Sequence, residues 1–184
     1  VEAVHLLDPT MLLTKDDYIT LVEKENIKES SGNLFTYILD SSREKNSIIE
    51  EIANKYNLKP FSVMQPKRFS DKDRKGIDEC VFPPVEQWIR GFMDAEFVVT
   101  DSFHGTVFSI LFNKPFVVIG NEIRGLSRFK SLLNIFNLED RLISEKRSLN
   151  TIMQLSKKEI DFNEVNKTLQ IWRTKSFSFL INNI

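Results

Sequence analysis

Two short apolar strands on either side of an apolar helix place the strongest constraint on the fold of this chain. They lie in the segment EFVVTDSFHGTVFSILFNKPFVVIG, residues 96–120. The runs FVVT and PFVVIG are almost wholly hydrophobic, which is typical of strands covered on both faces in a parallel sheet. Asn113-Lys114-Pro115 ends the helix between them. The segment therefore predicts a βαβ unit within an α/β fold whose sheet is mostly parallel.

The turn between the first strand and the helix holds the most conspicuous polar residues. Asp101 ends the strand, Ser102 can cap the helix, and His104 follows in the first turn. Open α/β sheets bind ligands at the carboxyl ends of their strands, where free amides and the helix dipole favour an anion. Because glycine has no Cβ to hold a ligand away, the backbone N–H groups of Gly105 and Thr106 are predicted to bind one.

A second predicted helix start carries three cations. Arg124, Arg128 and Lys130 gather at the beginning of a helix expected from about Ser127, although cations at this end oppose the helix dipole. Their position is favourable if they point, together with the helix amides, at one phosphate or carboxylate group. From the residues alone, chance surface charge explains them equally well.

The remaining elements follow from hydrophobic periodicity and turn residues. Further helices are expected at Lys15–Glu25, Arg43–Asn57 and Val85–Asp94. Further strands are expected at Asn33–Leu39 and Lys59–Pro66, and a short turn followed by a strand is expected at Leu138–Ile143. A long helix from Ser156 is expected to end the chain. Residues 1–155 are therefore predicted to form a Rossmann-like three-layer domain. Residues 156–184 are predicted to form a helix that packs on this domain or on another half of the protein.

The composition excludes several classes of function. With 25 basic and 26 acidic residues among 184, the net charge of −1 gives no general attraction to nucleic acid or anionic lipid. The single cysteine, Cys80, excludes an internal disulfide. The two histidines have no clustered cysteine, histidine or aspartate residues beside them, so a structural zinc site is not expected. No apolar run reaches the roughly 18 residues that a membrane span requires. A single domain with a substantial core is expected.

The residues TDSFHGTVFSILFNKPFVVIGN, followed by RGLSRFKSLL and NLEDR, resemble the polysaccharide pyruvyl transferase family. The resemblance is strongest from Val85 to Arg141, and weaker from DPTMLL through YILD. Members of this family resemble GT-B glycosyltransferases, in which two Rossmann-like halves face a cleft, and this chain resembles the carboxyl-terminal half. The resemblance implies transfer of an enolpyruvyl group from phosphoenolpyruvate to a sugar hydroxyl of a surface polysaccharide or its precursor. No cofactor is expected, and no metal is implied, because Asp40 and Asp101 are isolated carboxylates without a paired acidic motif.

The same resemblance implies roles for individual residues. His104 is the expected catalytic acid–base or phosphate-binding residue, since imidazole titrates closest to working pH. Many family members read SxRLHG, and this chain has Ser102 where they have the arginine that is associated with the donor. A hydroxyl cannot supply a cationic fork, so the donor is held by another cation or is a different compound. The implied substrate-binding residues are Asp101, Ser102, Gly105, Thr106, Arg124, Arg128 and Lys130.

Two other functions stay open beside pyruvyl transfer. One is a nucleotide-sugar glycosyltransferase of the same architecture, and the other is a non-catalytic binding or assembly module. For the transferase, the expected partners are phosphoenolpyruvate, a glycan acceptor and an amino-terminal domain that forms the facing wall of the cleft, so that residues 1–184 alone are expected to be inactive. The expected location is the cytoplasm, including the inner face of the membrane.

Overall fold

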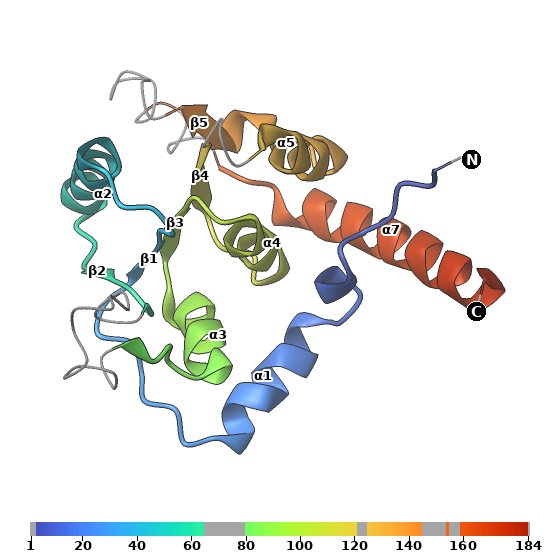
Figure 1. Cartoon of the computed structure of the whole chain (residues 1–184), viewed down its shortest axis with the longest axis horizontal. Helices are drawn as coiled ribbons and strands as arrows, with labels where there is room; N and C mark the ends of the chain where they lie inside the picture. The colour runs from blue at the N-terminus through green and yellow to red at the C-terminus, as the bar shows by residue number, and fades with distance from the viewer. Residues whose placement is uncertain (1–2, 65–79, 121–124, 145–153, 155–158, 184) are drawn as a thin grey trace.

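The computed structural model describes residues 3–64, 80–120, 125–144, 154 and 159–183 (Figure 1). Within this part, the strands form one parallel sheet in the order β2-β1-β3-β4-β5. The strands are β1 (Leu34–Tyr37), β2 (Pro60–Phe61), β3 (Phe97–Thr100), β4 (Phe116–Gly120) and β5 (Leu142–Ser144). The predicted α/β fold with a mostly parallel sheet is confirmed.

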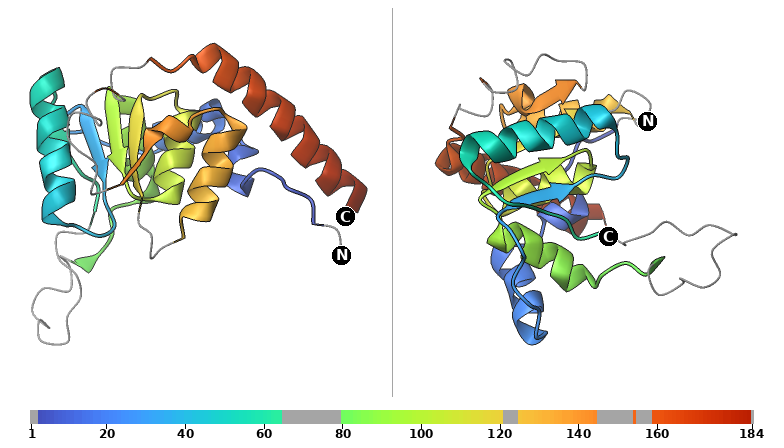
Figure 2. Two further views of the ribbon diagram at one scale, coloured as in Figure 1. Left: turned by 90° about the horizontal axis from the view of Figure 1, so that it is seen from above. Right: turned by 90° about the vertical axis from the view of Figure 1, so that its left-hand side faces the viewer.

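Helices cover both faces of the sheet, as the two-sided hydrophobic strands predict. In β3, Val98 belongs to the core on one face, whereas Phe97 and Val99 belong to the core on the other. Figure 2 shows α2 on one side of the sheet and the remaining helices on the opposite side, which gives three layers. The helices that enclose the sheet are α2 (Arg43–Tyr56), α3 (Val85–Asp94), α4 (Phe103–Leu111) and α5 (Leu126–Ile135).

The larger of the two cores is rich in aromatic rings. Phe35 of β1 and Phe92 of α3 are fully buried, and their ring centroids lie 4.9 Å apart in an edge-to-face arrangement. Burial of each such side chain contributes about 1.5–3 kcal/mol. Gly91 allows this approach, because a Cβ at this position would lie 2.8 Å from the ring of Phe35. The aromatic core thus fixes α3 against the strand whose carboxyl end borders the site.

Polar side chains close the amino ends of the helices near the start of the chain. Asp8 accepts a hydrogen bond from the N–H of Thr10 and caps the short 3-10 helix η1 (Pro9–Met11). Thr14 caps α1 (Lys15–Lys24) and forms a reciprocal capping box with Asp17. Beyond these caps, α1 packs beside α3, and Asp8 lies near His104 at the amino end of α4.

Some predicted elements differ in their bounds. The strand expected at Lys59–Pro66 is much shorter, since β2 covers Pro60–Phe61, and residues 65 and 66 lie outside the described residues. The turn and strand expected at Leu138–Ile143 are the 3-10 helix η3 (Glu139–Arg141) and β5. The terminal helix α7 runs from Phe162 to Asn183, so residues 159–161 are not helical, and Ser156 lies outside the described residues. The later start has a local cause, since Asp161 accepts hydrogen bonds from the next backbone N–H groups, those of residues 163 and 164.

The terminal helix α7 lies beside the amino-terminal segment of the chain (Figure 1). Val165 and Leu169 are buried in the larger core, which joins the first turns of α7 to the sheet domain. Farther along, the guanidinium of Arg173 donates to the carbonyl of Met11 at 2.9 Å and to that of Leu13 at 2.8 Å. These hydrogen bonds join α7 to the amino-terminal segment, which is far from it in sequence.

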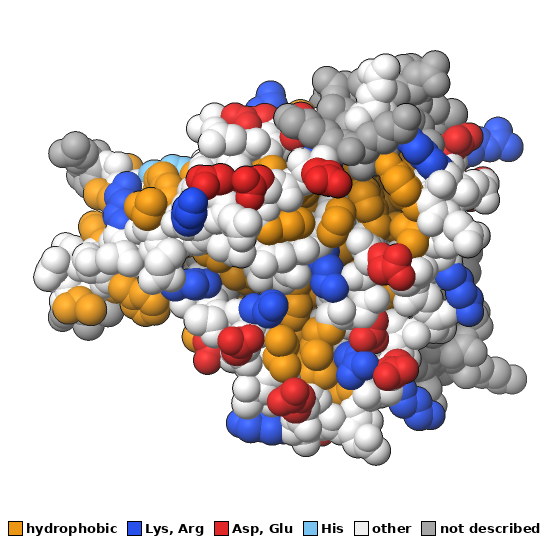
Figure 3. All heavy atoms as spheres, turned by 180° about the vertical axis from the view of Figure 1, so that it is seen from behind, with side chains coloured by type: hydrophobic (Ala, Val, Ile, Leu, Met, Phe, Trp, Pro, Cys, Tyr) orange, Lys and Arg blue, Asp and Glu red, His pale blue; other side chains and the backbone are white. Residues whose placement is uncertain are grey.

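The surface carries charges of both signs. Figure 3 shows a face on which exposed hydrophobic side chains lie among lysine, arginine, aspartate and glutamate side chains, and neither sign of charge dominates. This distribution agrees with the net charge of −1. In the part of the chain that the structure describes, no helix has the length and apolar character needed to cross a membrane.

Candidate functional site

The candidate site is the turn that joins β3 to α4. Ser102 is the N-cap of α4, with extended backbone angles, and its hydroxyl accepts a hydrogen bond from the N–H of Gly105 at 3.3 Å. The parallel register pairs Thr100, at the end of β3, with Tyr37, at the end of β1. The turn therefore lies at the carboxyl edge of the sheet, as predicted, and His104 is the second residue of the helix.

His104 projects away from the hydrophobic core. Its side chain is 54% exposed, and its Nε2 atom lies 3.8 Å from Oδ2 of Asp8. This separation is too long for a hydrogen bond, but it places a carboxylate where it can orient the ring. The ring of Phe103 meets the imidazole edge to face, at 5.6 Å between centroids. The imidazole is thus accessible to a ligand from solvent.

The amides predicted to bind an anion are occupied. The N–H of Gly105 donates to the Ser102 hydroxyl, and the N–H of Thr106 donates to the Ser102 carbonyl at 3.0 Å. The Thr106 hydroxyl is fully buried and donates to the same carbonyl. Both N–H groups are therefore engaged within the turn, and the ligand contacts of Gly105 and Thr106 stay a prediction. Across the described residues, the N–H groups of Phe103 and His104 are the first-turn donors of α4 without a protein acceptor.

Gly105 has a packing role instead. A Cβ at this position would lie 2.2 Å from Oγ1 of Thr100 and 3.0 Å from its Cβ. Real side chains do not approach so closely, so only glycine lets α4 lie directly on the end of β3. The glycine that the sequence placed beside a ligand is required by the contact between helix and strand.

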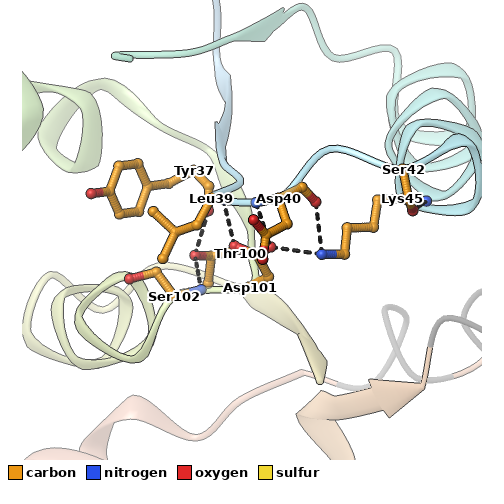
Figure 4. A network of polar contacts seen from close by, with 8 residues as sticks. All are labelled: Tyr37, Leu39, Asp40, Ser42, Lys45, Thr100, Asp101 and Ser102. Carbon is orange, nitrogen blue, oxygen red and sulfur yellow. Dashed lines mark hydrogen bonds and ion pairs between the residues drawn. The ribbon is translucent and has the colours of Figure 1, made fainter. Parts of the chain in front are cut away.

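Asp101 is also part of the structure rather than of an open binding surface. Its carboxylate is buried and accepts hydrogen bonds from the N–H groups of Leu39 at 2.7 Å and Asp40 at 3.2 Å. Nζ of Lys45 lies 2.7 Å from the same carboxylate (Figure 4). The predicted contact between Asp101 and substrate does not fit this burial. Ser102, likewise buried, acts as a helix cap.

An aromatic cavity opens beside His104. Its volume is about 490 Å³, and it lies between α1, α3, α4 and the end of β1. Burial raises the pKa of Tyr37 above its ordinary value, and the neighbouring charge of Asp101 raises it further. The phenol therefore stays protonated in neutral solution and can donate a hydrogen bond. Six aromatic side chains line the cavity: Tyr18, Tyr37, Phe82, Trp88, His104 and Phe108.

Arg128 and Lys130, the two predicted cations that the structure describes, do not converge. Arg128 is exposed, and its guanidinium lies 5.2 Å from the centroid of the Phe103 ring, on the side of a hollow of about 350 Å³ that also contains Asp8. Lys130 borders a separate hollow with Glu139. Arg124 lies outside the described residues. Of the two described cations, only Arg128 is therefore close to the turn that carries His104.

Sequence reasoning missed Asp8 and Lys45 as members of this region. The stretch DPTMLL contributed only to the weaker part of the family resemblance, whereas the fold brings Asp8 beside His104. Lys45 stands three residues before Ile48 and seven before Ile52, on the buried stripe of α2. A lysine at such a position is the signal that could have predicted a buried partner of opposite charge. Among the described residues, no group of three or more His, Cys, Asp or Glu residues could hold a metal ion.

Comparison with known proteins bears on identity. No curated protein matches the chain. One similar solved structure is the glycotransferase of kitacinnamycin, with 13% sequence identity and a TM-score of 0.46. The match covers 83% of this chain and 42% of that one, so the chain spans about two fifths of the length of that structure.

The family model for polysaccharide pyruvyl transferase matches residues 1–123 of the 184-residue chain. The match includes β1, β3 and the whole of α4, and it ends before the helix α5 that carries Arg128. Because it spans well over half of the sequence and contains the turn around His104, this chain belongs to the polysaccharide pyruvyl transferase family.

Proposed function

We propose that this chain is the donor-binding part of a transferase that moves the pyruvyl group of phosphoenolpyruvate onto sugar hydroxyls of a surface polysaccharide or its precursor. The observation that carries the proposal is the half-exposed imidazole of His104 beside two first-turn amides of α4 that have no protein acceptor among the described residues. Membership in a family of transferases supports it. The facing wall of the cleft and most acceptor contacts then belong to another domain.

The proposed reaction has simple requirements. In ketal formation, two hydroxyl oxygens of the acceptor form bonds to C2 of phosphoenolpyruvate, and the bond between C2 and the phosphate oxygen breaks. One hydroxyl proton ends on the methylene carbon and the other on the departing phosphate. His104 carries a proton between the acceptor hydroxyl and the donor, because an exposed imidazole is the side chain best able to do so near neutral pH.

The donor brings two anionic groups, a carboxylate and a phosphate. The N–H groups of Phe103 and His104 point out of the amino end of α4 and can receive one of them. Arg128, beside Phe103, can receive the other, and it supplies the cation that Ser102 cannot. The amino end of α5 adds to this field, since its N-cap Gly125 offers no capping side chain.

A nucleotide-sugar glycosyltransferase of the same architecture is the second candidate. The aromatic cavity beside His104 favours it, because cavities of about 490 Å³ with a ring-rich lining accept a base or a sugar ring. Under pyruvyl transfer, the same cavity would receive the apolar face of the acceptor sugar. The two candidates therefore predict different ligands: a pyruvyl transferase binds phosphoenolpyruvate without a nucleotide sugar, and a glycosyltransferase binds the nucleotide sugar without phosphoenolpyruvate.

Titration calorimetry with phosphoenolpyruvate, inorganic phosphate and uridine diphosphate glucose separates these functions. We expect phosphoenolpyruvate to bind, and we expect R128Q to weaken its binding about 10-fold or more, because a charge-assisted hydrogen bond contributes about 1.5–3 kcal/mol. K130Q is the matched control and keeps the wild-type affinity, since Lys130 borders another hollow. Binding of the nucleotide sugar alone would select the second candidate. Binding of none of the three would favour a non-catalytic module.

A further inference from the structure

The buried ion pair between Lys45 and Asp101 connects two turns at the carboxyl edge of the sheet. The side chains are each only 1% exposed, and Nζ lies 2.7 Å from Oδ2. Lys45 belongs to the first turn of α2, which follows β1, whereas Asp101 belongs to the turn that follows β3. Figure 4 shows the two side chains reaching toward each other across this edge.

Each partner also binds backbone groups of the turn after β1. Nζ of Lys45 donates to the carbonyl of Asp40 at 2.8 Å. The carboxylate of Asp101 accepts from the N–H groups of Leu39 and Asp40. The pair therefore binds both N–H groups and a carbonyl of the turn after β1. It fixes that turn to Asp101, the residue before the N-cap of α4.

A second set of contacts fixes the other side of Asp101. The hydroxyl of Thr100 donates to the carbonyl of Tyr37 at 2.8 Å and accepts from the N–H of Ser102 at 3.0 Å. Asp101 and its two neighbours are thus attached to the end of β1. His104 lies two residues beyond Ser102, in the first turn of the helix that Ser102 caps, so its position depends on these attachments.

Stability alone does not account for such a pair. Buried ion pairs are often replaceable by apolar residues of similar volume without loss of stability, because desolvation of both charges offsets their attraction. What an apolar pair cannot do is hold two backbone N–H groups and one carbonyl in fixed directions. The contacts of Lys45 and Asp101 therefore point to geometry as their contribution.

We propose that Lys45 and Asp101 are positioning residues that fix the amino end of α4, and with it the imidazole of His104, relative to the end of β1. This inference rests on the proposed function for its consequence in catalysis. The geometric part stands without it, because the direction of His104 can be observed in the free protein.

Nuclear magnetic resonance of the imidazole groups tests the geometric part. The chain contains two histidines, so the spectrum has two sets of imidazole signals, and H104Q assigns them. His5 is the internal control, because it lies on the amino-terminal segment, where its Nε2 is 3.2 Å from the Ser131 hydroxyl. In D101N we expect the His104 signals to shift and broaden and the His5 signals to stay in place.

Two further variants keep the test decisive. K114M is the matched control for loss of a half-buried lysine, because Lys114 donates to the Met93 carbonyl beyond the carboxyl end of α4, and it should leave the His104 signals unchanged. If D101N does not fold, the double variant K45M/D101N removes both charges and leaves none buried without a partner. It should show the same displaced His104 signals.

Turnover by the complete transferase supplies the readout for catalysis. We expect D101N to lower kcat by about 10- to 100-fold with a smaller change in KM, since misplacement of a reacting group by about 1 Å has effects of this size. Signals of His104 that superimpose on the wild type in a folded variant would overturn the inference, as would equal displacement of His5. Wild-type protein that neither binds nor consumes phosphoenolpyruvate would refute the proposed function and leave the signal test valid.

Discussion

Replacing Gly105 by alanine distinguishes a packing glycine from a glycine that admits a ligand. The new Cβ would lie 2.2 Å from Oγ1 of Thr100, so the threonine or the helix must move. Movement of that hydroxyl breaks its hydrogen bond to the Tyr37 carbonyl, which is partly buried, and the one from the Ser102 N–H, which is buried. The substitution should therefore destabilise the domain.

The magnitude follows from three contributions. Overpacking of a full interior costs about 1–3 kcal/mol. Displaced buried hydrogen bonds cost about 1–3 kcal/mol, and alanine recovers about 1 kcal/mol as the better helix former. The expected net loss in the free energy of unfolding is about 3 kcal/mol, which a domain with a stability of about 5–15 kcal/mol survives.

Urea unfolding followed by circular dichroism measures this loss. A double-mutant cycle with T100A provides the control, because removing the Thr100 hydroxyl and methyl relieves the closest contacts. In the T100A background, G105A should cost at least about 1 kcal/mol less than in the wild type. If G105A leaves the stability unchanged or raises it, as at an exposed helix position, the packing argument is refuted. If G105A kept wild-type stability but no longer bound an anion, Gly105 would have the predicted role in ligand binding.

Two other predictions concern the stability of the domain. Burial alone would raise the pKa of Asp94, but hydrogen bonds from Arg90 and Ser30 outweigh burial and lower the pKa below 3.8. The Asp94 carboxylate therefore stabilises the fold above that pH, and this contribution is lost as pH falls through the lowered pKa. Thermal unfolding should show a smaller difference between D94N and wild type at pH 3 than at pH 7, and a constant difference would contradict this. R173M removes both hydrogen bonds from Arg173 to the amino-terminal segment and should lower the free energy of unfolding in urea by about 1–3 kcal/mol, whereas an unchanged value would show that these contacts contribute nothing.

The βαβ unit around the site was predictable because its signals are local. The all-apolar strands FVVT and FVVIG require cover on both faces, and the structure provides it. The predicted helix Val85–Asp94 has the same bounds in the structure, since Pro83-Pro84 and the hydrophobic period define it within a few residues. The exposed position of His104 also followed from the order of strand, turn and helix.

The internal contacts of the site were not predictable, because they join residues that are distant in sequence. Lys45 and Asp101 are separated by 56 positions, so the place of Lys45 on a buried stripe indicates a partner of opposite charge but does not identify which residue it is. Gly105 and Thr100 are close in sequence, but their contact depends on how α4 folds back over β3, which the local sequence does not specify. A turn of polar residues at the end of a strand indicated ligand contacts, but several of these side chains are used to build the turn.

Phosphate release from phosphoenolpyruvate by the complete transferase, in the presence of a glycan acceptor, tests the central claim most directly when wild type, H104Q and H5Q are compared. General acid–base catalysis contributes about 10²–10⁴-fold, so H104Q should lose at least about 100-fold in turnover while keeping its thermal stability. H5Q, altered at the other histidine, should retain wild-type turnover. Wild-type turnover in folded H104Q would contradict the account.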